Sequence, residues 1–271
     1  MKSIYNLLKE QIRQQPIVKN SILGDSHPWK RSHYIILSEI IKENLSKREE
    51  LQNQRKFELG NSISHITLQR FFESDYHYKT HNDLRFLKTL DKICIFLGFK
   101  DLNAFVTNVK EKNLYSEYFF KNEFTTDIVY KYCRANFEFF KFFPELKLEI
   151  FDELIFPEAP FIERIKNYSS KLCENGLRLF TNNNRSNFEI FDLDVISEEN
   201  DKMVIKTQEF WNLVFVVEET GEEYVVNELN TQIYFVKNIE NNWRIWDNYN
   251  PNSGLLNNII KKNRLKNERD G

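Results

Sequence analysis

The residues best suited to proton transfer lie in the last third of the chain, within runs of β-branched and aromatic residues. The polar candidates are Asn227, Glu228 and Asp247, and the rings expected beside them are Trp211 and Trp243. Side chains alternate between the two faces of a β-strand, so one face could carry rings together with a carboxyl. Burial among rings raises the pKa of a carboxyl, as acid–base catalysis requires.

The histidines limit that chemistry, because all five precede residue 82. A histidine–aspartate pair cannot form within the segment that carries Asp247, and only a lone carboxylate remains. His77 and His81 are four residues apart, a spacing that on a helix would place both rings on one face. Their surroundings are typical of a loop without a third ligand, so we expect no metal site. We expect the second half to enclose a packed or ligand-filled pocket rather than a catalytic one.

Isolated glycines and cysteines exclude further classes of protein. No two of the seven glycines lie within a dozen residues of each other, so no phosphate-binding glycine loop can form and we expect no cofactor. The three cysteines are widely spaced and the chain has no signal-type start, which indicates a cytoplasmic location. The most apolar stretch, residues 93–99, is far shorter than the roughly 20 residues of a membrane-spanning helix. We therefore expect no membrane segment.

A second set of candidate residues lies on a short helix expected over residues 65–72. Ser62 or Ser64 can cap its first turn. The apolar side of this helix consists of Leu68, Phe71 and Phe72. His65, Gln69 and Arg70 lie away from that side, and Gln and Arg are suited to bidentate contacts with adenine and guanine edges. These three residues are the candidates for binding nucleic acid.

The spacing of apolar residues changes near residue 176. Before it, spacings of three and four residues predict helices, including one near 84–97, one near 124–143 and one at 161–173. After it, β-branched and aromatic residues predict strands at 188–195, 203–217, 224–236 and 243–249. The net charge is +5 over residues 1–150, −10 over 151–260 and +3 over 261–271. A polyanion would therefore bind the first half or the tail.

Residues 59–106 resemble the helical N-terminal domain of a group of predicted bacterial regulators related to helix-turn-helix repressors. The matching residues are Leu59-Gly60, Ser64, Thr67-Leu68, Arg70, Leu87, Leu90, Phe96-Leu97-Gly98-Phe99 and Phe105. The resemblance implies that the helix starting near Ser64 is the recognition helix, with His65, Gln69 and Arg70 facing a groove. The sequence departs from the pattern at residues 46–58, which mix acidic and basic side chains. That segment is either an exposed continuation of the preceding helix or an inserted surface segment.

The second half resembles the nuclear transport factor 2-like superfamily, in which a curved antiparallel sheet wraps around helices as a cone. The resemblance rests on the helix at 161–173, on the strands KMVIKTQEFWNLVFV and TQIYFVKN, and on the closing strand NNWRIWDNYNP. It covers about 130 residues. Members include dehydratases, isomerases, ligand-binding sensors and domains that dimerise or bind protein, so the resemblance implies a fold rather than one function.

We therefore expect an α+β protein with a helix-turn-helix-like domain at 1–115, a cone-shaped sheet domain at 116–258 and a basic tail at 259–271. The function expected is that of a non-catalytic bacterial regulatory or binding protein. Its first domain would contact duplex nucleic acid, and its second would dimerise, bind a protein partner or hold a ligand. Two alternatives stay open: a protein–protein adaptor subunit of an operon-encoded complex, and a small-molecule lyase or isomerase that uses Asp247 or Glu228.

Overall fold

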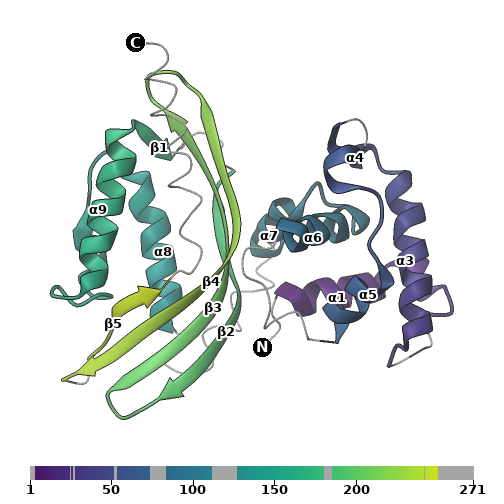
Figure 1. Cartoon of the computed structure of the whole chain (residues 1–271), viewed down its shortest axis with the longest axis horizontal. Coiled ribbons are helices and arrows are strands. Elements are labelled where there is room, and N and C mark those ends of the chain that lie inside the picture. Colours follow the sequence, from purple (N-terminus) through teal and green to yellow (C-terminus); the bar gives the residue numbers. More distant parts are fainter. Residues whose placement is uncertain are drawn as a thin grey trace. The chain divides into compact units, whose positions relative to one another are not determined.

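The computed structural model describes residues 4–24, 26, 28–51, 54–73, 84–111, 127–179, 185–240 and 242–249. The chain divides into two compact units, Met1–Tyr118 and Phe119–Gly271. Helices make up the described part of unit 1, and unit 2 contains a curved antiparallel sheet with helices (Figure 1), so the expected α+β class is confirmed. The domain boundary expected near residue 115, the pair His77 and His81, and the basic tail lie outside the described residues.

Unit 1 is built from short helices around an aromatic core. Its elements are α1 (Ile4–Gln14), α2 (Pro16–Lys19), α3 (Arg31–Ser46), η1 (Glu49–Leu51), α4 (Gln54–Leu59), α5 (His65–Phe72), α6 (Leu84–Phe96) and α7 (Leu102–Glu111). The ring of Tyr5 lies 6.2 Å from that of Phe71 and 5.9 Å from that of Phe86, while Trp29 lies 4.9 Å from Phe72. These rings join α1, α5 and α6, so each helix buries its apolar side against the others.

Helix α5 has the bounds and the apolar side that the sequence predicts. Gly60 adopts a left-handed φ of 68°, which ends the preceding α4. Ser64 then caps α5, because its Oγ accepts a hydrogen bond of 3.1 Å from the backbone N–H of Thr67. Leu68, Phe71 and Phe72 are buried. The turn from α4 into α5 is therefore set by local residues.

The polar segment at 46–58 is not a continuation of the preceding helix, and most of its described residues are exposed. Helix α3 ends at Ser46, and the chain then forms η1 and α4, with Leu51 buried. The guanidinium of Arg48 donates to the carbonyl of Phe96 at 3.2 Å, and that of Arg55 donates to the carbonyl of Lys100 at 2.8 Å. Part of the charge in this segment thus ties it to carbonyls at and beyond the end of α6, an arrangement that charge pattern alone does not predict.

Unit 2 places two long helices against the concave side of its sheet (Figure 1). Its elements are α8 (Asp127–Lys141), η3 (Leu148–Phe151), α9 (Pro160–Glu174), β1 (Leu177–Leu179), β2 (Asn187–Glu198), β3 (Lys202–Val217), β4 (Glu223–Ile239) and β5 (Asn242–Tyr249). The strands are antiparallel, in the order β1-β3-β4-β5, and β2 also pairs with β3. The four predicted strands are confirmed. β1 has only three residues, too few for a sequence pattern.

The core of unit 2 lies between the concave side and these helices. Val129, Cys133 and Phe139 of α8 pack in one buried cluster with Leu172 of α9 and Phe215 of β3. At the end of α9, Gly176 has a φ of 67°, which turns the chain into β1. Among the described residues, no helix has both the length and the apolar character needed to cross a bilayer.

Candidate functional site

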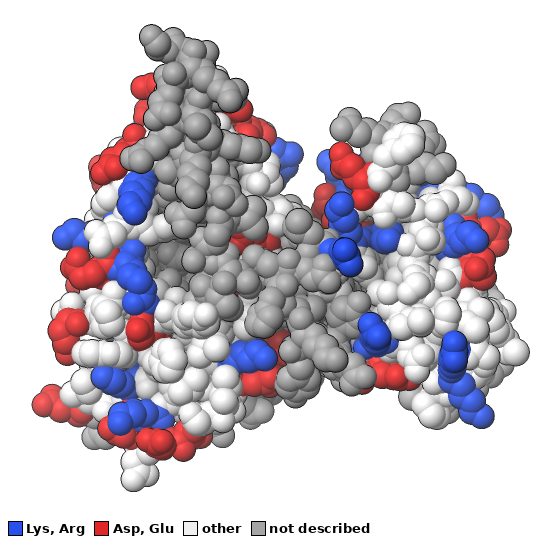
Figure 2. All heavy atoms as spheres, viewed as in Figure 1, with Lys and Arg blue, Asp and Glu red and all other residues white. Residues whose placement is uncertain are grey.

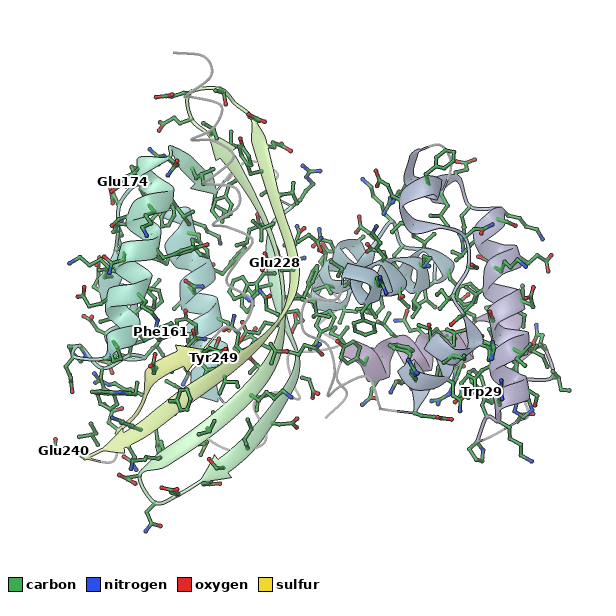
Figure 3. The ribbon with its side chains drawn as sticks, in the orientation of Figure 1. Trp29, Phe161, Glu174, Glu228, Glu240 and Tyr249 are labelled. Carbon is green, nitrogen blue, oxygen red and sulfur yellow. The ribbon has the colours of Figure 1, made fainter. Side chains whose placement is uncertain are left out.

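Unit 2 contains a cavity of about 820 Å³ between the concave side of the sheet and its two long helices. Five alternate residues of β4 line it: Val226, Glu228, Asn230, Gln232 and Tyr234. β3 contributes Glu209, Trp211 and Leu213, and the helices contribute rings such as Tyr132, Phe140 and Phe161. The exposed side chains of Lys171 and Tyr249 also line the cavity, which therefore opens to solvent. Figure 3 labels Glu228 on the sheet side and Phe161 on the helix side.

The register of β3 and β4 brings two glutamates to one wall of the cavity. Glu209 lies opposite Asn230, and Trp211 lies opposite Glu228. Side chains directly opposite each other in an antiparallel pair have Cβ atoms about 4.5–5.5 Å apart. The four side chains thus form one polar and aromatic patch on the concave side.

Glu209 is held by a closed set of hydrogen bonds. Its Oε1 accepts from the hydroxyls of Thr207 and Tyr234, each at 2.7 Å, and its Oε2 accepts from Nε1 of Trp211 at 2.8 Å. The Sγ of Cys133 lies 3.8 Å from the same Tyr234 hydroxyl. Burial raises the pKa of Glu209, and these hydrogen bonds oppose the rise. Both oxygens of this carboxyl are therefore satisfied by the fold itself.

Glu228 has a different environment. Its Oε2 accepts a hydrogen bond of 2.7 Å from Nδ2 of Asn230. Its Oε1 and the Oδ1 of Asn230 are buried and have no hydrogen-bond partner among the residues that the structure describes. The side chains are 9% and 5% exposed. Burial raises the pKa of Glu228, and the hydrogen bond from Asn230 opposes that rise. Unlike Glu209, Glu228 is therefore only partly satisfied by the described part of the fold.

Asp247 lies at the cavity in an ion pair. Its Oδ1 accepts from the guanidinium of Arg164 on α9 and from the backbone N–H of Asn248, the latter at 2.7 Å. Arg164 also donates to the carbonyl of Asn248 at 2.8 Å, which joins α9 to β5. The side chain of Arg164 is 49% exposed, so this pair belongs to the solvent-facing part of the cavity. A carboxylate that is engaged in this way is poorly placed to act as a base.

Three of the five residues predicted for the pocket line the cavity, namely Trp211, Glu228 and Asp247. Asn227 does not, because it neighbours Glu228 on the strand and points to the opposite side. There its Nδ2 donates to Oδ1 of Asn212 at 3.1 Å. Trp243 is not part of the cavity lining and instead packs against the core cluster, since it lies near the start of β5 while Asp247 lies near its end.

Glu209 and Arg164 are the site residues that the sequence analysis missed. Glu209 shares the parity of Trp211 and Leu213 along the strand, so alternation alone could have identified it. Arg164 carries no such signal, because its place depends on how α9 packs against β5, 83 residues away. Among the described residues, no group of histidine, cysteine or carboxylate side chains could hold a metal ion.

The second candidate surface lies on α5 in unit 1. Arg70 is exposed, and Gln69 is half-buried with its Nε2 donating to both oxygens of Glu73 at 3.0 and 3.1 Å. His65 is half-buried, and its Nε2 has no hydrogen-bond partner in the described part of the chain. Figure 2 shows basic and acidic side chains interspersed over unit 1 on the face in view, rather than a continuous basic stripe. Arg70 is thus the most exposed of the three candidate residues.

No protein-family model and no curated protein matches the chain. Among solved structures, it is similar to the intermembrane-space region of the chloroplast protein ARC6, at 14% sequence identity and a TM-score of 0.37. The match covers 47% of this chain and 93% of that one. A similarity at this level carries no argument about function.

Proposed function

We propose that this chain is a non-catalytic binding protein whose sheet unit holds a small molecule in the cavity of about 820 Å³. The observation that carries the proposal is the pair Glu228 and Asn230: both residues line that cavity, and each has one buried acceptor atom without a partner among the described residues. A buried acceptor without a partner costs about 1–3 kcal/mol, and a ligand that supplies donors removes this cost. The cavity volume is in the range of small-molecule sites, about 300–1,000 Å³.

The resemblance of the second half to the nuclear transport factor 2-like superfamily supports the same proposal, since that superfamily includes ligand-binding sensors. All three cysteines are free, and we place the protein in the cytoplasm. In the lyase or isomerase alternative, Glu228 is the remaining candidate for the catalytic carboxyl, because Asp247 is paired with Arg164. Catalysis would require Glu228 to exchange a proton with the bound molecule, whereas binding requires only that its free oxygen accept a hydrogen bond.

A titration with simple probes tests the ligand-binding proposal. The full chain, labelled for backbone NMR, would be titrated with phenethylamine, phenethyl alcohol and phenylacetate. We expect at least one probe to shift the amide signals of cavity residues on β3, β4 and α9. Ser169 is buried and lines the cavity, so Ser169→Phe should fill part of the space and weaken binding. The proposal would be contradicted if no probe shifts these signals at millimolar concentration.

For unit 1 we propose contact with duplex nucleic acid through α5. The local observations that favour it are the α4–turn–α5 arrangement with its Ser64 cap and the exposed guanidinium of Arg70. Lys and Arg contacts to phosphate would give most of the affinity, which would fall steeply with salt. Gln69 would have to release Glu73 before its amide could contact a base edge.

Arg70→Ala tests this second proposal, with Arg31→Ala as the matched control, since Arg31 is exposed at the start of α3. A preferred duplex would first be selected from a random-sequence pool at about 50 mM salt, where phosphate contacts are strong. Loss of a base contact from Arg70 should then weaken binding by about 1–3 kcal/mol, with little change for the control. Absence of any duplex binding, or an equal loss in both variants, would contradict it.

A further inference from the structure

The polar stripe along β4 has more acceptors than donors. Gln232 is matched, because its Oε1 accepts from Nδ2 of Asn248 at 2.7 Å. Asn230 donates one N–H of Nδ2 to Glu228, while its Oδ1 and the Oε1 of Glu228 have no partner among the described residues. An amide oxygen can only accept hydrogen bonds, and so can an ionised carboxylate oxygen. The two atoms without partners in the described residues thus call for a molecule that donates at least two hydrogen bonds.

Two ring donors on the same side of the sheet are already used elsewhere. Trp211 lies directly opposite Glu228 in the sheet, yet its Nε1 donates to Glu209 at 2.8 Å. Tyr234, two positions beyond Gln232 on the same stripe, likewise donates to Glu209. The hydrogen bonds that complete the environment of Glu209 therefore draw donors away from Glu228.

The charges around the cavity favour a cation over a neutral donor. Arg164 is paired with Asp247, and none of the ion pairs within the described residues involves Glu228. Lys171 lies on the exposed side of α9. A charge-assisted hydrogen bond is roughly twice as strong as a neutral one, and a buried carboxylate without a counter-charge is costly. An ammonium group supplies both the missing charge and several donors in one small volume.

The other walls of the cavity determine what the rest of the molecule is like. Trp211, Leu213, Val226 and Phe161 line it. Trp211 also stacks on Phe188, with ring centroids 5.0 Å apart, which holds its indole in place beside Glu228. Aromatic faces attract cations, and apolar walls favour a hydrocarbon or aromatic body.

We propose that the ligand of this cavity is a small primary amine with an apolar body, whose ammonium group donates to Glu228 Oε1 and to Asn230 Oδ1. This assignment rests on the proposed function of unit 2 and names the chemical class of its ligand. In this assignment, Glu228 supplies the negative charge, Asn230 supplies the second acceptor, and Trp211 covers the ammonium group and part of the apolar body of the ligand.

Calorimetric titration of the full chain at neutral pH with phenethylamine, phenethyl alcohol and phenylacetate tests the assignment. The three probes share a ring and a similar length but differ in charge. We expect phenethylamine to bind at least about tenfold more tightly than the alcohol, because its contact with Glu228 is charge-assisted. Phenylacetate should bind most weakly, since its carboxylate would lie near the carboxylate of Glu228.

Glu228→Gln removes the charge with little change of shape, and Glu163→Gln is the matched control on the exposed side of α9. Glu228→Gln should weaken phenethylamine by about tenfold and change the alcohol by less than about threefold. Glu163→Gln should leave both affinities unchanged. Circular dichroism would verify that each variant is folded before titration.

The outcomes separate this inference from the proposal on which it depends. Suppose that the probes bind, that Ser169→Phe weakens them, and that the amine has no advantage or Glu228→Gln has no effect on it. Then the amine assignment is overturned while ligand binding stands. Tightest binding of phenylacetate would also overturn it. If no probe binds at millimolar concentration, both the assignment and the ligand-binding proposal fail.

Discussion

The surroundings of Glu209 and of Glu228 differ sharply, although both glutamates lie on the concave side of the same sheet. Around Glu209, three donors saturate the carboxyl. Around Glu228, one amide satisfies one oxygen and the other oxygen has no partner among the described residues. The difference teaches that burial alone does not define a binding group. A buried carboxyl with complete hydrogen bonding holds the fold together, whereas one with an open acceptor can hold a ligand.

The largest expected effect is the loss of stability in Glu209→Ala. The substitution leaves the hydroxyls of Thr207 and Tyr234 and the indole N–H of Trp211 without their shared acceptor. It also opens a void in the wall. We expect the free energy of unfolding to fall by about 2–4 kcal/mol, measured by urea denaturation. A loss below about 1 kcal/mol would contradict the structural role assigned to Glu209.

Glu228→Ala should have a much smaller effect on stability. Within the described part of the chain, its carboxyl accepts one hydrogen bond, from Asn230, and no cation compensates its burial. We expect the free energy of unfolding to change by at most about 1 kcal/mol, because the lost bond is offset by removal of the desolvated charge. The same urea titration measures it, without added ligand. If Glu228→Ala costs as much as Glu209→Ala, the contrast between the two glutamates is wrong.

The pH dependence of stability follows from the raised pKa values of both carboxyls. In the folded chain each lies above the ordinary value near 4.5, so the folded state binds more protons than the unfolded state in that window. The free energy of unfolding should therefore fall as the pH rises from about 4.5 through the raised values. Glu209→Gln should flatten this part of the curve, as measured by urea denaturation across pH. A rise in the difference between wild type and variant over the same window would contradict the sign.

Arg164→Ala should have the smallest effect. Its pair with Asp247 is half-exposed, and exposed ion pairs contribute about 0–1 kcal/mol. The midpoint of thermal unfolding should change only slightly in Arg164→Ala, whereas loss of a residue from the buried network around Glu209 should lower it strongly. A change as large as that of Glu209→Ala would mean that the contact between α9 and β5 depends on this pair.

Much of the fold could be predicted because the deciding interactions are local. Ser64 caps α5 within three residues, and the alternation of Trp211 and Leu213 identifies one side of β3 from neighbouring positions. The same parity rule separates Asn227 from Glu228, since successive side chains on a regular strand point to opposite faces of the sheet. Part of the cavity wall could thus be predicted from single segments of the sequence.

The remainder depends on contacts between distant segments. The register that places Trp211 opposite Glu228 and Glu209 opposite Asn230 joins two strands through a turn, and a one-residue slip would reverse every side chain. The place of Arg164 depends on the packing of α9 against β5. Only that three-dimensional arrangement determines which donors bind Glu209, and therefore which acceptor lacks a partner among the described residues.

A crystal structure of the full chain soaked with phenethylamine tests the central claim most directly. The account predicts the amine nitrogen about 2.7–2.9 Å from Glu228 Oε1, the range of charge-assisted hydrogen bonds, with Asn230 Oδ1 as its second acceptor. The phenyl ring should lie among the apolar side chains of the cavity. An amine bound at any other place, or a cavity in which Glu228 Oε1 contacts no part of the molecule, would contradict the account.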